Sequence, residues 1–183
     1  MGMGVEFVVC RTVRDCAAML DAVSKPMPGD SFVIRQPDRP YLQEVGAPVE
    51  PLRIARTTAC NLPGMATHPE VATAVEYVVT FLQTQGHQVE QAQPIFEYEE
   101  YLKAISIGWI YGFDGLLEGL PLYNLTGQPA ISLPLAQTTD DLPIGIQFVA
   151  HFGREDVLLR LAAMLEAPRQ WRDRTPAFVS LKN

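Results

Sequence analysis

The chain has 183 residues, of which 48% are hydrophobic and 19% are charged. This length and composition fit one globular domain, which we expect to span residues 1–183, and they argue against a disordered chain. The formal net charge of −7, with Lys and Arg residues scattered along the chain, argues against binding to nucleic acid or to an anionic membrane surface.

The N-terminus and the cysteines indicate the compartment. No apolar stretch is long enough to span a membrane, and MGMGVEFVVC lacks the basic region and the cleavage site of a secretory signal. The three cysteines, Cys10, Cys16 and Cys60, have no metal-like spacing, so we expect small buried apolar residues in a reducing compartment. We therefore expect a soluble cytoplasmic protein.

The N-terminal part predicts a strand, a helix and a surface segment. Residues 5–9 are β-prone. Thr12 as N-cap and Asp15 at the third helical position then predict a helix, with apolar residues at helical spacing as far as Val23. KPMPG at residues 25–29 ends that helix, and the Pro-rich residues 26–51 predict an extended or turn-rich surface excursion.

A strand, a helix and a strand follow within about forty residues. Residues 52–55 read as a short strand and apolar residues around Val89 as another. The helix between them is predicted from Thr67 as the capping hydroxyl, Pro69 in the first turn and Glu70 at the third position, with Gly86 as its stop. Its apolar stripe consists of Val71, Val75, Val78 and Leu82. This order predicts a βαβ unit with a parallel pair and a right-handed crossover.

The C-terminal half predicts further α/β structure. Residues 98–120 are helical in part, with four glycines that indicate either close helix packing or a broken helix and loop. Two apolar strands, residues 131–135 and 144–150, are joined by the turn-forming AQTTDDLP. Residues 156–166 predict an amphipathic helix with one apolar face, made of Val157, Leu161 and Leu165.

A catalytic nucleophile is not evident among the serines and lysines. No serine neighbours another serine or lies in a G-x-S-x-G motif, and the chain has no Gly-Gly pair to build an oxyanion loop. The lysines fall in a turn, on a predicted helix and in the C-terminal tail, where we expect solvated charges. We therefore expect structural roles for Ser24, Ser31, Ser106, Ser132, Ser180, Lys25, Lys103 and Lys182.

The histidines and acidic pairs also favour structural roles. His68, His87 and His151 are widely separated and lack the spacing of a zinc site. We expect His68 to support a helix start, and His87 to place partial positive charge at a helix C-terminus. The acidic pairs at residues 97–100 and 140–141 fit solvated helix and turn surfaces.

Three segments, taken together, resemble the amidase signature family of amide hydrolases. CRTVRDCAAMLDAVSKPMPGD is similar to the helix and PGD-type loop after the catalytic region of that family. PLRIARTT and HPEVATAVEYVVTFLQTQGHQVEQAQP resemble its next βαβ segment. YNLTGQPAISLPLAQTTDDLPIGIQFVAHFGREDVLLRLAAMLE resembles its C-terminal strand pair and helix, and QWRDRTP its ending. The match is collinear over most of the chain.

The resemblance implies a fold and a chemistry. The fold is α/β, with a mixed β-sheet flanked by helices and containing a βαβ unit. The chemistry is hydrolysis of an amide C–N bond by a Ser–cis-Ser–Lys triad, without a metal or an organic cofactor. The lysine and the Gly/Ser-rich signature of the family have no match in this chain, so no catalytic residue is carried over. Residues 95–122 stand where members have a long helical insert. The chain thus resembles the C-terminal part of the family with a shortened middle.

The T-G-x-P-A turn of the family lies close to its active centre. The resemblance therefore implies that Asn124, Thr126, Gly127, Gln128 and Pro129 line a substrate pocket. The structural alternative, which the residues alone favour, is that Gly127 and Pro129 shape a turn and that residues 131–135 form a core strand.

Three hypotheses about function follow. The first is the C-terminal portion of an amidase that is inactive alone and meets its amide substrate only in an intact enzyme. The second is an amidase-derived binding or assembly module without catalysis, and the third, the least supported, is an active hydrolase with a relocated nucleophile. Because the edge of a partial parallel sheet exposes unpaired backbone, we also expect self-association or a complementing polypeptide.

Overall fold

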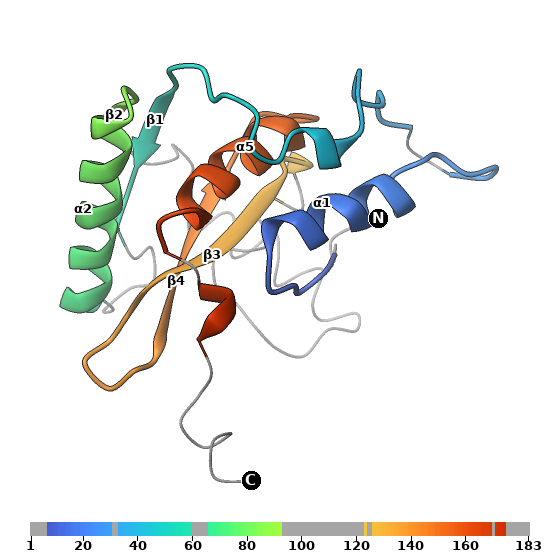
Figure 1. The fold of residues 1–183 in the computed structure, drawn as a ribbon. Helices are drawn as coiled ribbons and strands as arrows, with labels where there is room; N and C mark the ends of the chain where they lie inside the picture. The colour runs from blue at the N-terminus through green and yellow to red at the C-terminus, as the bar shows by residue number, and fades with distance from the viewer. Residues whose placement is uncertain are drawn as a thin grey trace, which may run out of the picture. The chain divides into compact units, whose positions relative to one another are not determined.

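The computed structural model describes residues 7–30, 33–59, 66–92, 123, 126–169 and 171–174. The chain divides into two compact units (Figure 1). The first consists of residues 1–50 and 122–183, and the second consists of residues 51–121.

The first helix of the first unit, α1 (Val13–Val23), begins where the sequence predicts. The hydroxyl of Thr12 accepts a hydrogen bond from the backbone N–H of Asp15 at 3.1 Å, which satisfies one of the free donors of the first turn. Val13 and Ala17, four residues apart on one face, are buried. The predicted strand at residues 5–9 is wrong for residues 7–9, which pair with no strand in the described part of the chain.

The Pro-rich segment after α1 lies largely at the surface and is anchored at one point. Its side chains are mostly exposed as far as residue 40, where the short helix η1 (Tyr41–Gln43) begins. η1 places Tyr41 and Glu44 in the interior. The carboxylate of Asp21 on α1 accepts hydrogen bonds from the N–H groups of Tyr41 (2.7 Å) and Leu42 (2.9 Å), so α1 holds the start of η1.

A β-hairpin forms the sheet of this unit. β3 (Ala130–Gln137) and β4 (Pro143–Val149) form where the two apolar runs predict strands, and they pair antiparallel. The register shifts between Pro134 and Ala136. A bulge at this place suits Pro134, which has no N–H for the ladder. Leu133, Leu135 and Ile144 are buried.

The helix α5 (Glu155–Glu166) contacts β3, α1 and η1 (Figure 1). Val157, predicted on its apolar face, is only partly buried, because the face is centred on the residues that follow it. After α5, the short helix η2 (Trp171–Asp173) buries Trp171. The buried residues of α5 are Leu158, Leu159, Leu161, Ala162 and Leu165.

The second unit is the predicted βαβ unit. β1 (Arg53–Arg56) and β2 (Gln88–Gln91) are parallel, with Ile54 opposite Val89, and α2 (Pro69–Thr84) connects them. Ala74, Val78 and Leu82 are the buried residues of α2. Gly86, at φ +88°, ends the helix as predicted, since glycine adopts the left-handed region without strain. Together the two units confirm the α/β class.

One detail of α2 differs from the prediction. The N-cap is His68, whose Nδ1 accepts a hydrogen bond from the N–H of Glu70 at 3.3 Å. Thr67 does not cap, because its hydroxyl donates to the carbonyl of Thr58, after β1. Pro69 is thus the first helical residue and Glu70 the second.

Some predictions fall outside the described residues, namely the partial helix at 98–120, Asn124, Lys103, Lys182 and Cys60. Within the described part of the chain, no helix is both long and apolar enough to cross a membrane.

Candidate functional site

The candidate pocket residues lie in a tight turn that leads into β3. Tyr123 and Thr126 have helical backbone, and Gly127 then reverses the chain with φ +71°. Gln128 and Pro129 follow, and both are partly buried. The predicted turn at Gly127 and Pro129 is confirmed, and so is the strand after it. Whether the turn lines a pocket stays a prediction.

Hydrogen bonds tie this turn to the end of β4. The hydroxyl of Thr126 donates to Oε1 of Gln128 at 3.0 Å, and Nε2 of Gln128 donates to the carbonyl of Ala150 at 3.3 Å. The N–H of Ala150 in turn donates to the carbonyl of Pro129 at 3.1 Å. The two polar side chains are therefore held in place, with one hydroxyl and one amide near the surface.

Phe152 covers the turn. A Cβ atom at Gly127 would lie 2.8 Å from Cε2 of Phe152, so only a hydrogen fits beneath the ring. The ring is 58% exposed. An aromatic side chain this exposed, next to a polar turn, gives the turn an apolar neighbour. Phe152 is not among the residues predicted from the sequence; its signal there is an aromatic residue in HFG directly after an apolar strand.

Neither described serine is arranged as a nucleophile. Ser132 is exposed on β3, and its Oγ lies close to Gly145 of β4, where a Cβ would come within 2.9 Å. This contact explains the glycine at that position. No histidine, lysine or carboxylate of the described residues hydrogen bonds to the hydroxyl of Ser24 or Ser132, so neither has a base to activate it. Lys25 is exposed, as predicted.

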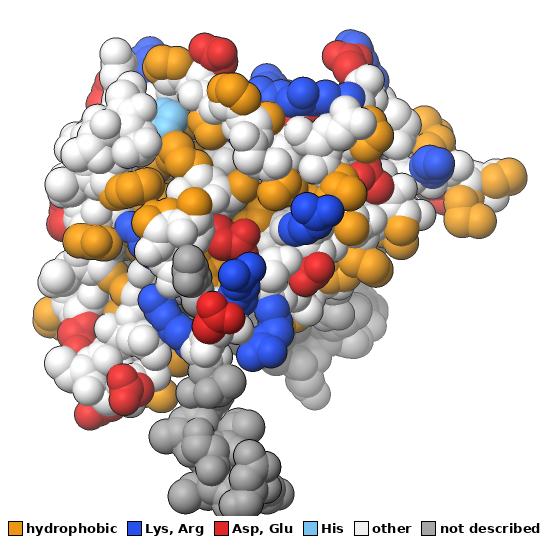
Figure 2. Space-filling view, viewed as in Figure 1, with side chains coloured by type: hydrophobic (Ala, Val, Ile, Leu, Met, Phe, Trp, Pro, Cys, Tyr) orange, Lys and Arg blue, Asp and Glu red, His pale blue; other side chains and the backbone are white. Residues whose placement is uncertain are grey.

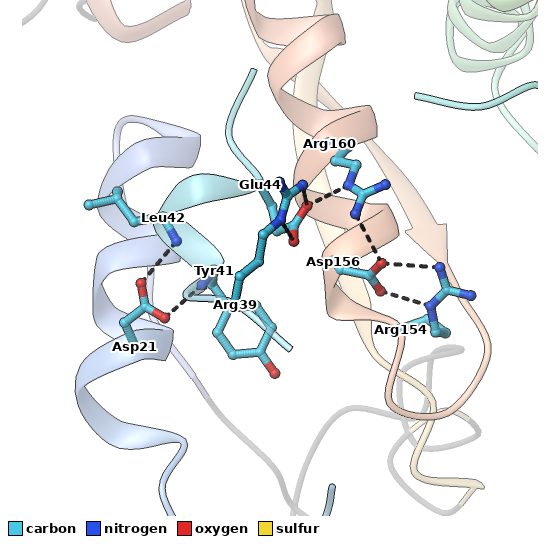
Figure 3. A network of polar contacts seen from close by, with 8 residues as sticks. All are labelled: Asp21, Arg39, Tyr41, Leu42, Glu44, Arg154, Asp156 and Arg160. Atoms are coloured by element: carbon cyan, nitrogen blue, oxygen red, sulfur yellow. Dashed lines mark hydrogen bonds and ion pairs between the residues drawn. The ribbon is translucent and has the colours of Figure 1, made fainter. Parts of the chain in front are cut away.

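A network of ion pairs joins η1 to α5 (Figure 3). Arg39 meets Glu44 with two donors, Nε on one carboxylate oxygen and Nη2 on the other at 2.6 Å. Arg160 of α5 donates its Nε to the same carboxylate. One turn earlier in α5, Asp156 accepts from Nε and Nη2 of Arg154 at 2.8 and 3.0 Å and lies 3.6 Å from Nη2 of Arg160. Three guanidinium groups thus pair with the two carboxylates of Glu44 and Asp156.

The charges in this network hold one another in their ionised forms. Glu44 is only 3% exposed, yet the hydrogen bond from Arg39, together with Arg160, lowers its pKa to about 2. The hydrogen bond from Arg154 lowers the pKa of Asp156. A carboxylate with such a low pKa is a poor general base at neutral pH. We therefore interpret the network as a structural tie between η1 and α5.

His87 corrects another prediction. Its side chain is 4% exposed, its Nδ1 accepts a hydrogen bond from the N–H of Leu52 at 3.1 Å, and its Nε2 has no hydrogen-bond partner among the residues that the structure describes. Burial lowers the pKa of His87, which favours the neutral imidazole. The prediction of partial positive charge at the end of α2 is therefore wrong. This histidine connects β1 to the start of β2.

The described cysteines and acidic residues form no evident site. Cys10 and Cys16 are partly exposed, so the prediction that they are buried is wrong for these two. Their position at the start of α1 leaves them accessible from the surface. Within the described ranges, no group of three or more His, Cys, Asp or Glu side chains could hold a metal ion.

A comparison with protein families decides the assignment. The sequence model of the amidase family, described as Amidase, matches residues 2–115 and 96–159. The chain belongs to the amidase family. The solved structure of 6-aminohexanoate cyclic dimer hydrolase shares the fold, with a TM-score of 0.68 at 24% identity over 92% of this chain. The resemblance that the sequence motifs indicate is therefore confirmed.

Individual relatives are amidases and related hydrolases. The 6-aminohexanoate-cyclic-dimer hydrolase of Pseudomonas sp. (strain NK87) is 26% identical over 278 residues, which cover 98% of this chain and 56% of that protein. The putative amidase AmiC of Mycobacterium leprae is 59% identical over 51 residues, 28% of this chain and 11% of that protein. This member of the amidase family thus spans about half the length of the cyclic-dimer hydrolases that it matches.

Proposed function

We propose that this chain forms the C-terminal portion of an amidase that hydrolyses an amide C–N bond, and that these 183 residues are not catalytic alone. The match to the amidase family over residues 2–159 carries the proposal. Amide hydrolysis is the chemistry that the family resemblance implies, and the names of the relatives agree with it.

The triad of the proposed enzyme comes from outside these residues. The sequence has no adjacent serines and no Gly/Ser-rich segment that matches the family signature. The described serines have no base, and the one described lysine is exposed. Activation of a serine hydroxyl requires a base held against it, so an active site needs further residues.

The turn at Thr126–Gln128 suits recognition of an amide in this proposal. Its single hydroxyl proton is donated within the turn, to Oε1 of Gln128 at 3.0 Å or to the carbonyl of Tyr123 at 3.4 Å, which leaves a lone pair of the Thr126 oxygen to accept from an amide N–H. One N–H of Gln128 bonds to Ala150, and the other can donate to a substrate carbonyl. The Phe152 ring supplies an apolar surface for the chain next to the amide.

The same proposal includes a middle segment that is shorter in this chain than in its relatives. The alignment with the cyclic-dimer hydrolase extends over 278 residues, more than this chain contains, so that relative carries residues without a counterpart here. The two segments matched to the family share residues 96–115. When a chain lacks a stretch of its family, the parts of the family model on either side of that stretch can both align to the residues at the junction. The shared residues therefore support an internal deletion in this chain. The deletion would change the substrate pocket.

The chain needs a partner in this proposal, either a second copy or a complementing polypeptide. Parallel strands are found almost only in sheets covered on both faces, whereas β1 and β2, the two strands of this unit within the described residues, have partly or fully exposed side chains. Hydrophobic side chains are also exposed on α1 and the loop after it (Figure 2). They include Met19, Val23, Met27, Val33 and Ile34. An apolar surface of this kind favours association.

Genomic sequence tests the proposal against a non-catalytic module. If the DNA upstream of codon 1 encodes an in-frame Gly/Ser-rich amidase signature, the enzyme proposal is supported. That longer product should then hydrolyse amides, with 6-aminohexanoate cyclic dimer as a first substrate for mass spectrometry. If no such signature is encoded there or in a neighbouring reading frame, the alternative, an amidase-derived binding or assembly module, is favoured.

A further inference from the structure

The side-chain amide of Gln128 is held in one orientation. The carbonyl of Ala150 can only accept a hydrogen bond, so the group that faces it at 3.3 Å is the Nε2 of Gln128. Oε1 of Gln128 is therefore turned toward the hydroxyl of Thr126, which lies 3.0 Å away. The backbone at this place is fixed as well, because the N–H of Ala150 donates to the carbonyl of Pro129 at 3.1 Å. The hairpin thus sets the orientation of this amide before any ligand arrives.

This orientation leaves one donor and one acceptor site of the Gln128 side chain without a partner among the described residues. A carboxamide has two N–H donors and two acceptor sites on its oxygen, all in one plane. Ala150 takes one of the donors, and Thr126 takes one of the acceptor sites. Gln128 is partly exposed, so a small molecule can approach it. A single ligand reaches both remaining sites only when it presents an acceptor and a donor on the same side.

The ring of Phe152 lies beside this amide. It packs on Gly127, the residue between Thr126 and Gln128, so closely that a Cβ there would clash with it. The ring is largely exposed. An apolar surface next to a few oriented polar groups is the usual composition of a small-molecule site. An amide attached to a flat apolar group therefore matches both parts of the turn.

We propose that Gln128 is a specificity-determining residue that selects amides with an N–H and a C=O on the same side, and that Phe152 packs against the group attached to the amide carbon. The inference rests on the amidase function proposed above. A primary amide presents its C=O and one N–H side by side, so it can accept from Gln128 and donate to it at once. A trans secondary amide points these two groups in opposite directions, so only one of them reaches Gln128 at a time.

Binding of benzamide and of N-methylbenzamide to the full chain tests this role. Two-dimensional NMR of the isotope-labelled protein follows the side-chain amide of Gln128 and the backbone amides of Gly127 and Phe152 during each titration. We expect shifts at these residues, and an affinity for benzamide about five-fold higher than for N-methylbenzamide, the factor that one hydrogen bond supplies. Acetamide should bind more weakly than benzamide, because it has no ring to pack on Phe152.

A pair of glutamine variants separates this role from general effects on the hairpin. Gln137 is the matched control, because its Nε2 also donates to a carbonyl, that of Asp141 at 3.4 Å. Gln128→Met should remove the preference for benzamide over N-methylbenzamide, whereas Gln137→Met should retain it. Phe152→Leu should weaken the binding of both amides and leave the preference between them unchanged. The spectra show whether each variant is folded, and the preference of wild type decides the matter if Gln128→Met does not fold.

Four results would overturn the proposal. They are equal affinities of wild type for the two amides, a preference that persists in folded Gln128→Met, shifts confined to other residues, and no binding up to the solubility limit of benzamide. The titration measures binding and needs no turnover. Its failure therefore leaves the amidase proposal standing, whereas failure of the longer product to hydrolyse any amide counts against the amidase proposal itself.

Discussion

At the scale of single residues, Gly127 shows two reasons why one position favours glycine. Its φ of +71° lies in the left-handed region, where a side chain is strained, and the ring of Phe152 occupies the space of a Cβ. The sequence predicts the turn from the Gly and Pro spacing. It does not predict Phe152, because that contact joins the turn to the residues after β4 and depends on the hairpin register.

Gly127→Ala should destabilise the fold by more than backbone strain alone. Gly153 is the matched control, since its φ is +70° but a Cβ there would meet nothing within 4 Å. We expect Gly153→Ala to cost about 1–2 kcal/mol in the free energy of unfolding, and Gly127→Ala to cost more. Adding Phe152→Ala should bring the cost of Gly127→Ala down to that of the control. Equal costs for the two single variants in urea denaturation would show that the ring contact is absent.

Glu44 should make stability depend on pH in the acid range. The pKa of Glu44 is about 2 in the folded protein against an ordinary 4.5, so its contribution is complete above 4.5 and is lost as the pH falls toward 2. Glu44→Gln should lower the free energy of unfolding by roughly 1.5–3 kcal/mol at pH 7, and the difference from wild type should shrink between pH 4.5 and pH 2.

The exposed Glu50 offers the control for this acid dependence. Glu50→Gln should leave the free energy of unfolding within about 0.5 kcal/mol of wild type at every pH. A difference between wild type and Glu44→Gln that stays constant from pH 7 to pH 2 would contradict the ion-pair network shown in Figure 3.

At the scale of elements, local signals predicted most of the structure. The cap at Thr12, the stop at Gly86 and the alternating apolar strands act within a few residues, and the structure places α1, α2 and the hairpin accordingly. Contacts between distant residues were not predictable in this way. Glu44 is held in the interior by Arg160, 116 positions away, and burial favours the neutral form of His87, which accepts a hydrogen bond from Leu52 across the βαβ unit.

The βαβ unit should weaken on mild acidification because of His87. Burial lowers the pKa of His87 below its ordinary 6.5, so the neutral form stabilises the fold above pH 6.5, and this stability is lost as the pH falls toward the folded pKa. Protonation at Nδ1 would also break the hydrogen bond from Leu52. Thermal melts of wild type should therefore show a falling melting temperature between pH 7 and pH 5.

His87→Asn keeps an acceptor for Leu52 and does not titrate, so its melting temperature should fall less over this interval. The exposed His151 gives the control, and His151→Asn should retain the pH dependence of wild type. If wild type and His87→Asn lose stability in parallel, His87 is not the source of the dependence.

At the scale of the whole molecule, the chain is part of an amidase fold, and its association state follows from what it exposes. We expect light scattering to give a mass above the 20.3 kDa of one chain. Val23→Glu together with Met27→Glu should weaken association by charging the apolar side chains on and after α1. Leu142→Glu, in the exposed turn between β3 and β4, is the control and should not weaken association. A compact monomer of wild type at micromolar concentration would contradict the proposed need for a partner.

The family could be predicted from the sequence because its motifs are local and collinear. The substrate pocket could not be predicted from the sequence, because a pocket is assembled from distant parts of a chain. Asn124 lies outside the described residues, and Thr126 to Pro129 form a turn whose role depends on what faces it. The central proposal is therefore that the turn belongs to an active site whose nucleophile lies elsewhere.

Labelling with a fluorophosphonate tests that proposal most directly. The purified 183-residue chain is incubated with the probe beside an intact amidase that carries the serine pair and reacts with it, and each protein is examined by intact mass spectrometry. We predict that the intact amidase gains one adduct and that this chain gains none, because neither Ser24 nor Ser132, the two serines in the described part of the chain, has a base held against it. A single labelled serine in the folded chain, lost on heat denaturation, would show that these residues contain a catalytic nucleophile and would contradict the account.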